Sequence, residues 1–157
     1  MKKILEPILL MMTIGGGFAG IDEIHMKFSH MNEPSGGDYF VIGVALLLQV
    51  YVVIAGVMFA HNKTKMKHLK RALLLQVPWI SSPFLFYRFG AGVDWTVIGY
   101  AHGVNGYTNF GNSFGFEINP HYPWAIGVNF VALALYLLIL KVFRSNNDNY
   151  KRPVAST

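Results

Sequence analysis

Four long apolar stretches divide the chain, and polar segments separate them. The stretches cover residues 4–21, 40–60, 72–90 and 124–143. A helix needs about 20 apolar residues to cross the hydrocarbon core of a bilayer, and a soluble protein of this length lacks the polar faces needed to coat four such helices. The pattern therefore predicts an all-α membrane protein. We expect one integral membrane domain over residues 1–144, a four-helix transmembrane bundle, followed by a disordered cytoplasmic tail over 145–157.

The basic residues sort to one side of this arrangement. Eleven of the thirteen lysines and arginines flank the N-terminus, the link between the second and third stretches, or the end of the fourth. Because cytoplasmic flanks of membrane helices are enriched in these residues, we expect a multi-pass protein of the cytoplasmic (inner) membrane with both termini in the cytoplasm. A second interpretation treats residues 1–19 as a cleaved signal peptide, because two lysines precede an apolar stretch that ends in small residues.

Composition narrows the class of protein. The chain is 53% hydrophobic and only 13% charged, whereas soluble domains carry about 25% charged residues. The chain has no cysteine, which excludes disulfide bonds, thiol catalysis and thiolate metal sites. The net charge of +5 agrees with attraction to anionic headgroups of a lipid bilayer, and a short lysine-rich link between two spans predicts no nucleic-acid partner.

The link over residues 91–123 is rich in glycine and aromatic residues. Trp95–Ile98 and Phe114–Ile118 have strand-like composition, whereas Asn105-Gly106 and residues 109–112 have turn chemistry. We therefore expect the bundle to carry a small β-like extended cap on its external face. In and beside this link lie the candidate contacts for a partner or substrate: Arg88, Asp94, Trp95, Tyr107, Glu117 and His121.

Polar and small residues inside the predicted spans indicate how helices meet. Three amides are expected to hydrogen-bond neighbouring helices: Gln49, Gln76 and Asn129. Pro78 and Pro83 predict a kinked or broken helix in the third stretch. Small residues four positions apart favour close helix contacts: Gly16 with Gly20, and Gly56 with Ala60.

Histidines supply the available metal and acid–base hypotheses. Imidazole and thioether ligands suit Cu(I), and the weak candidates for such a site are His25, Met26, His30 and Met31. Residues five apart point about 140° away from each other on a helix, so this set needs a loop, and a solvated segment is the favoured interpretation. An acid–base site is conceivable from four external side chains: Asp94, His102, Glu117 and His121.

The sequence contains no Walker A, GxGxxG, HExxH or GxSxG motif, and no cofactor is expected. We expect a non-enzymatic accessory protein that binds a membrane or periplasmic protein partner through residues 91–123, with a homo-oligomer as a further candidate. Two alternatives stay open. A small oligomeric transporter or channel predicts a polar cavity that reaches Gln49 or the Pro78 kink, and a membrane enzyme or metal-handling protein would use the external histidines.

Overall fold

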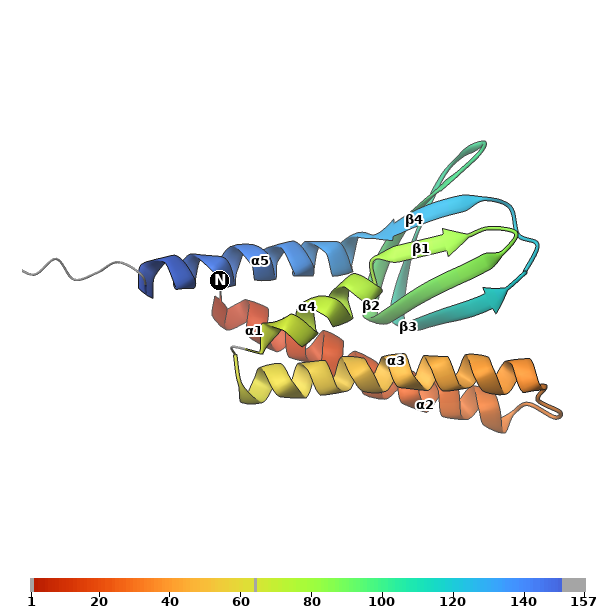
Figure 1. Ribbon diagram of the computed structural model, residues 1–157, viewed down its shortest axis with the longest axis horizontal. Coiled ribbons are helices and arrows are strands. Elements are labelled where there is room, and N and C mark those ends of the chain that lie inside the picture. Colours follow the sequence, from red (N-terminus) through yellow and green to blue (C-terminus); the bar gives the residue numbers. More distant parts are fainter. Residues whose placement is uncertain (1, 64, 151–157) are drawn as a thin grey trace, which may run out of the picture.

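The protein combines helices with a four-stranded antiparallel sheet (Figure 1). The computed structural model describes residues 2–63 and 65–150, with side chains from 3–63 and 65–142. The predicted all-α four-helix bundle is therefore wrong: the fold is mixed, and its sheet is far larger than the small cap expected from the external link. Residues 151–157 of the predicted tail lie outside the described residues.

Two long antiparallel helical segments form one layer. The first consists of α1 (Lys2–Leu10), a π-helical turn η1 (Met11–Gly15) and α2 (Gly16–Ser29), and the second is α3 (Gly36–His61). Helix α3 begins at a capping box, in which the Ser35 hydroxyl accepts a hydrogen bond from the Asp38 backbone N–H and the Asp38 carboxylate accepts one from the Ser35 backbone N–H. This pairing satisfies donors that a helix N-terminus otherwise leaves free.

Small residues allow these two segments to approach closely, although of the two predicted pairs only Gly20 and Gly56 lie at the contact between them. A Cβ atom on Gly17 would lie 2.5 Å from Val53 Cγ2, and one on Gly56 would overlap the Thr13 hydroxyl. Gly16 faces the sheet instead, where a Cβ would lie 2.6 Å from the Gly92 nitrogen. Ala60 is exposed, so the predicted Gly56–Ala60 pair contributes only its glycine to the contact.

The third apolar stretch does not form a membrane span. Helix α4 (Met66–Leu75) ends early, and the chain continues into strands β1 (Pro78–Ser81) and β2 (Leu85–Tyr100). Proline lacks the N–H group that would continue the helix, and the aromatic and β-branched residues that follow favour a pleated strand. Apolar runs of strand and helix have similar composition, which explains why hydropathy alone predicted a helix here.

The sheet curls until its strands form a ring. Strands β2 and β3 (Gly103–Ile118) make a hairpin whose register runs from Leu85↔Ile118 to Tyr100↔Gly103. Strand β1 pairs with the first half of β2, strand β4 (Ala125–Asn129) pairs with the second half, and β1 and β4 also pair with each other. The predicted turns at residues 105–106 and 109–112 are wrong, because both lie inside β3.

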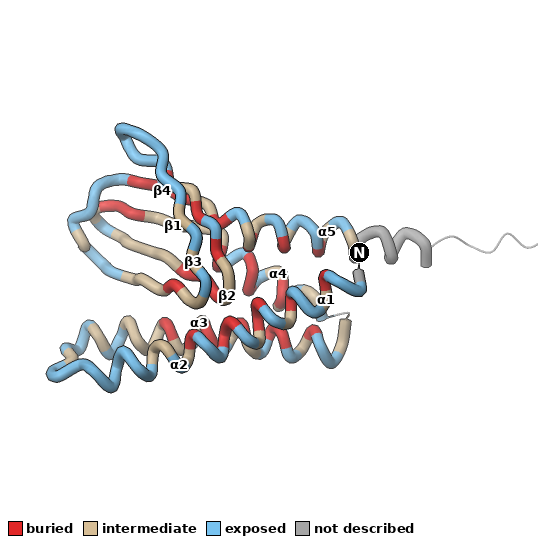
Figure 2. The backbone as a smooth tube through the Cα atoms, turned by 180° about the vertical axis from the view of Figure 1, so that it is seen from behind, coloured by how far each residue is buried: buried red, intermediate tan, exposed pale blue. Residues whose placement is uncertain are grey.

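Helix α5 (Phe130–Tyr150) follows β4 and packs with α4 beside the first helical layer (Figure 1). One apolar cluster joins α1, α3, α4 and α5 around buried side chains that include Leu9, Phe59, Leu73 and Ile139. A second cluster joins α3 and α4 to β2. Figure 2 shows buried positions gathering where these elements face one another, while the hairpin end and the far end of α2 are exposed.

Two helical segments, Lys3–Ser29 and Gly36–His61, are long and apolar enough to cross a membrane by length and composition. Among the described residues Phe130–Val142 is a shorter apolar helix, so two candidate spans replace the four predicted ones. Large apolar side chains face outward from both long segments: Met11 is 66% exposed and Leu47 is 72% exposed. Signal sequences and core helices of soluble proteins pass the same length test.

Candidate functional site

The curl of the sheet brings distant residues of the hairpin together. Arg88 pairs with Gly115, and Tyr107 pairs with Thr96, so the two positions lie eight residues apart along β2. That separation would be roughly 26 Å in a flat strand. The guanidinium carbon of Arg88 nevertheless lies 4.6 Å from the centre of the Tyr107 ring, which requires the sheet to bend back on itself.

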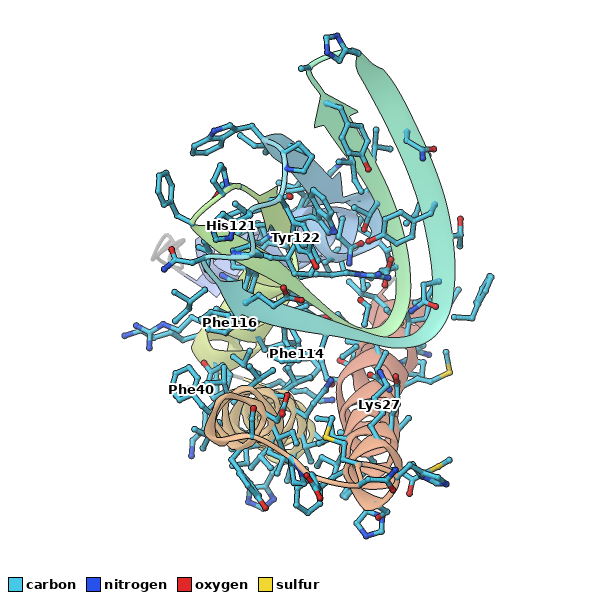
Figure 3. All side chains as sticks on the ribbon, turned by 90° about the vertical axis from the view of Figure 1, so that its right-hand side faces the viewer. Lys27, Phe40, Phe114, Phe116, His121 and Tyr122 are labelled. Carbon is cyan, nitrogen blue, oxygen red and sulfur yellow. The ribbon has the colours of Figure 1, made fainter. Side chains whose placement is uncertain are left out.

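A pair of glycines lies midway along this bend. Gly92 and Gly111 are opposite each other in the hairpin, with φ angles of 89° and 129°. Side chains rarely tolerate this left-handed backbone, so glycine at both positions permits the bend. Figure 3 looks at the sheet end-on and shows Tyr122 within the curl, with Phe114 and Phe116 on the opposite face toward the helices.

The inner face of the curl carries a buried carboxylate. Asp94 is only 2% exposed, and it accepts a hydrogen bond of 2.9 Å from the Ser113 hydroxyl and a longer one of 3.4 Å from the Thr96 hydroxyl. Gly90 leaves room for this group, since a Cβ there would lie 2.6 Å from Ser113 Oγ. The carboxylate is thus held by hydroxyl donors within the sheet.

Arg88 lies on the same face without an acidic partner. Among the described side chains, the ion pairs are Lys27–Glu23 at 2.6 Å and Lys63–Glu6 at 3.0 Å. The buried Nε of Arg88 has no hydrogen-bond partner. Burial raises the pKa of Tyr107, although the neighbouring Thr96 hydroxyl and the Arg88 charge oppose that rise. The Arg88 guanidinium is therefore held by stacking on an aromatic ring.

An aromatic row closes one end of the inner face. Phe86 lies 5.6 Å from both Trp79 and Tyr122, measured between ring centres. The Tyr122 hydroxyl donates a long hydrogen bond of 3.5 Å to Glu117, whose negative charge raises the pKa of Tyr122. His121 precedes Tyr122 in a left-handed conformation with φ 60°, and its backbone N–H donates to the Pro83 carbonyl.

The six predicted contact residues therefore divide into three groups. Arg88, Asp94 and Tyr107 share the inner face of the curl, and Glu117 and His121 lie near its aromatic end. Trp95 lies on the opposite face, where its ring is 5.4 Å from Phe130. His102 is in the turn at the far end of the hairpin, remote from His121, so the structure does not assemble the acid–base set.

The weak metal candidates lie at the end of α2. His25, Met26, His30 and Met31 are all exposed, and the Nδ1 atom of His30 lies 2.7 Å from the Met26 carbonyl oxygen. Within the described part of the chain, no three histidine, aspartate or glutamate side chains gather as a metal ion would require. Among the described residues, the fold therefore brings no group of three metal-binding side chains to this proposed copper site.

Strand β3 is the feature of the site that the sequence did not reveal. It is an edge strand, since the sheet order is β1-β4-β2-β3 and β3 pairs with β2 alone among the described strands. From Gly103 to Ile118 it contains one charged residue, Glu117, and no proline. Edge strands are commonly protected by lysine, proline or a short length. Here Val104 is 75% exposed and Phe110 is 81% exposed.

Three features define the candidate site. The buried carboxylate is held by hydroxyl groups, the arginine is stacked on a ring, and the edge of β3 is open for pairing. A fold alone does not reveal a function, which must be argued from the site. No family model matches the chain, and no curated protein or solved structure is similar enough to assign it to a family.

Proposed function

We propose that this is a non-enzymatic membrane protein that binds an extended segment of a partner protein along the open edge of β3. The observation that carries the proposal is that edge itself: β3 is 16 residues long, pairs only with β2 among the described strands, and is mostly exposed over its first half, Gly103–Phe110. Each free N–H and C=O group on an edge strand is a template for another strand. In strand addition, the backbone supplies affinity and alternate side chains supply specificity.

The membrane setting rests on the helices and the basic residues. The two candidate spans expose apolar side chains along their lengths, which a bilayer would cover. In Figure 1 the start of α1, the end of α3 and the far end of α5 lie at one end of the molecule, and the sheet lies toward the other. The lysine-rich segments belong to the first end. The positive-inside rule then favours a cytoplasmic-membrane protein with both termini inside and the sheet on the outer side.

The composition of β3 supports a protein partner. The exposed half of the strand, from Gly103 to Phe110, has no charged side chain. It therefore does not repel a partner strand electrostatically, whether that strand carries positive or negative charge. Exposed aromatic residues lie within this half, at Phe110, and beside it, at Tyr100, and aromatic side chains are enriched at protein interfaces. Removal of residues 95–118 would delete most of the hairpin, so side-chain substitutions on β3 are the better test.

A photo-crosslinking amino acid at Phe110 tests the proposal in intact cells. We expect a discrete adduct with a second protein, and we expect Val104→Lys combined with Thr108→Lys to abolish it, because charge on an edge strand blocks strand addition. Ile126→Lys is the matched control: Ile126 is 67% exposed but lies on the interior strand β4. Circular dichroism of the purified variants checks that the sheet is retained.

Three outcomes would contradict the proposal. The adduct could survive the two edge lysines, it could be lost equally in the Ile126→Lys control, or its mass could be that of two copies of this chain. The last outcome would assign the edge of β3 to self-association and support the homo-oligomer in place of a heterologous partner.

A further inference from the structure

A cavity of about 150 Å³ lies between α2, α3 and β3. Its walls are mainly apolar and include Ile24, Ile42, Ala45 and Phe114. Lys27 on α2 lines it as well. Figure 3 shows Lys27 on the helix side of this region and Phe114 on the sheet side. The cavity lies outside the curl of the sheet and beside the second half of β3, away from the exposed half over Gly103–Phe110 where the partner is proposed to pair.

Unpaired amide groups mark this cavity. Gln49 is 1% exposed, and both its side-chain oxygen and its side-chain nitrogen are buried with no hydrogen-bond partner. The buried side-chain oxygen of Asn112, also in the cavity wall, has no partner either. Buried polar groups in native proteins are nearly always hydrogen-bonded, so the unpaired Gln49 amide and the unpaired Asn112 oxygen in one cavity indicate a missing partner.

The glycine at position 20 leaves the space that the side chain of Gln49 occupies. A Cβ atom on Gly20 would overlap the Gln49 amide group. Gln76 gives the contrast: it is equally buried, at 3% exposure, but its amide makes two hydrogen bonds, of 3.0 and 3.1 Å. The unpaired state of Gln49 is therefore a local property and not a general consequence of burying glutamine in this fold.

We propose that the cavity binds a small molecule with an apolar body and a terminal hydroxyl group, of the phenol or short-chain alcohol class. A cavity of roughly this volume holds a body the size of benzene. The Gln49 amide offers one donor group and one acceptor, and Asn112 offers an acceptor. A hydroxyl both donates and accepts and can pair with these atoms. A carboxylate ligand could only accept hydrogen bonds and would leave the Gln49 oxygen unpaired. Lys27 would not attract it either, because its charge is already paired with Glu23 at 2.6 Å.

Nuclear magnetic resonance of the full-length, ¹⁵N-labelled chain in detergent micelles tests this proposal. The side-chain NH₂ signals of Gln49 are identified as the pair that is missing from Gln49→Leu. We expect phenol to shift this pair saturably, and toluene, which has the same ring and no hydroxyl, to bind about tenfold more weakly or worse, because an analogue without the hydroxyl leaves the amides unpaired. In Gln49→Leu, followed through backbone signals of the cavity wall, the preference for phenol should disappear.

Asn112→Ala provides a second variant should Gln49→Leu fail to fold, and it should weaken phenol while leaving toluene unchanged. Asn105→Ala removes an exposed amide from the same strand and should change neither. Equal responses to phenol and toluene, or an absence of any saturable shift because the cavity holds only water, would overturn the proposal. Neither result bears on the crosslinking experiment at β3, so the two proposals fail separately.

Discussion

Replacing Gln76 with methionine tests whether one buried amide holds α4 to the sheet. Gln76 Oε1 accepts a hydrogen bond of 3.0 Å from the Ala91 backbone N–H, and Gln76 Nε2 donates one of 3.1 Å to the Ala72 carbonyl. Methionine has a similar shape and cannot replace either bond. Ala91 is only 1% exposed, so its N–H would be left buried and unpaired.

The cost of the change follows from these contacts. Stranding a buried donor costs about 1–3 kcal/mol, and loss of the second hydrogen bond adds roughly 1 kcal/mol. We therefore expect Gln76→Met to lower the free energy of unfolding by about 2–4 kcal/mol, a large fraction of the roughly 5–15 kcal/mol that stabilises an ordinary domain. Gln49→Met is the matched control, because neither polar atom of the Gln49 side chain has a partner in the protein, and we expect it to be neutral or stabilising.

Reversible unfolding in mixed micelles would measure both free energies, and hydrogen exchange at the Ala91 amide would localise the effect. That amide should exchange faster in Gln76→Met and be unchanged in Gln49→Met. The reasoning would be refuted by equal destabilisation of the two variants, or by a Gln76→Met protein as stable as the parent with normal protection at Ala91.

Other substitutions test separate parts of the fold. Gly16→Ala should destabilise the folded protein by about 1–3 kcal/mol, because its Cβ would lie 2.6 Å from the Gly92 backbone nitrogen. Gly43→Ala, in open space within α3, should instead stabilise it by about 0.5–1 kcal/mol. Thermal unfolding of the two variants distinguishes these results. Ser35→Ala removes the capping box and should increase hydrogen exchange in the first turn of α3 alone. Burial raises the pKa of Tyr87 to about 12, so the folded state keeps a phenol proton that the unfolded state loses near pH 10. The free energy of unfolding should therefore fall as the pH rises from 10 to 12. Tyr87→Phe should remove that dependence in a pH series of unfolding curves.

Hydropathy predicted the helix over residues 40–60 and the one that begins within residues 4–21, because long apolar runs with few charges favour a helix. The prediction for residues 124–143 was right only in part, since residues 125–129 form strand β4 and helix α5 begins at Phe130. It failed at residues 72–90, where the chain changes from helix to strand after Leu75. Hydropathy averaged over a window of about 20 residues does not register a change from helix to strand when both parts are apolar. The proline at position 78 and the aromatic residues after it were present in the sequence, but a kinked helix accommodates them as well as a strand does.

The candidate site was predictable only in part. Composition indicated that Arg88, Asp94 and Tyr107 belong to one region, but their meeting on one face depends on a bend at Gly92 and Gly111, and the φ angles of glycines cannot be read from sequence. The turn chemistry at Asn105-Gly106 suggested a hairpin end too far along the chain. The open edge of β3 depends on which strands pair, a long-range property that local patterns do not encode.

The ring of strands sets an order on assembly. The β2–β3 hairpin can form as soon as its own residues are made, whereas β1 and β4 pair across about 50 residues, from Pro78 to Val128. A chain emerging from the ribosome can pair β1 with β2 early, but the other side of β1 must stay unpaired until β4 has been made. During that interval the second half of β2 and the free side of β1 lack a partner, and unpaired strands make a newly made chain prone to aggregation.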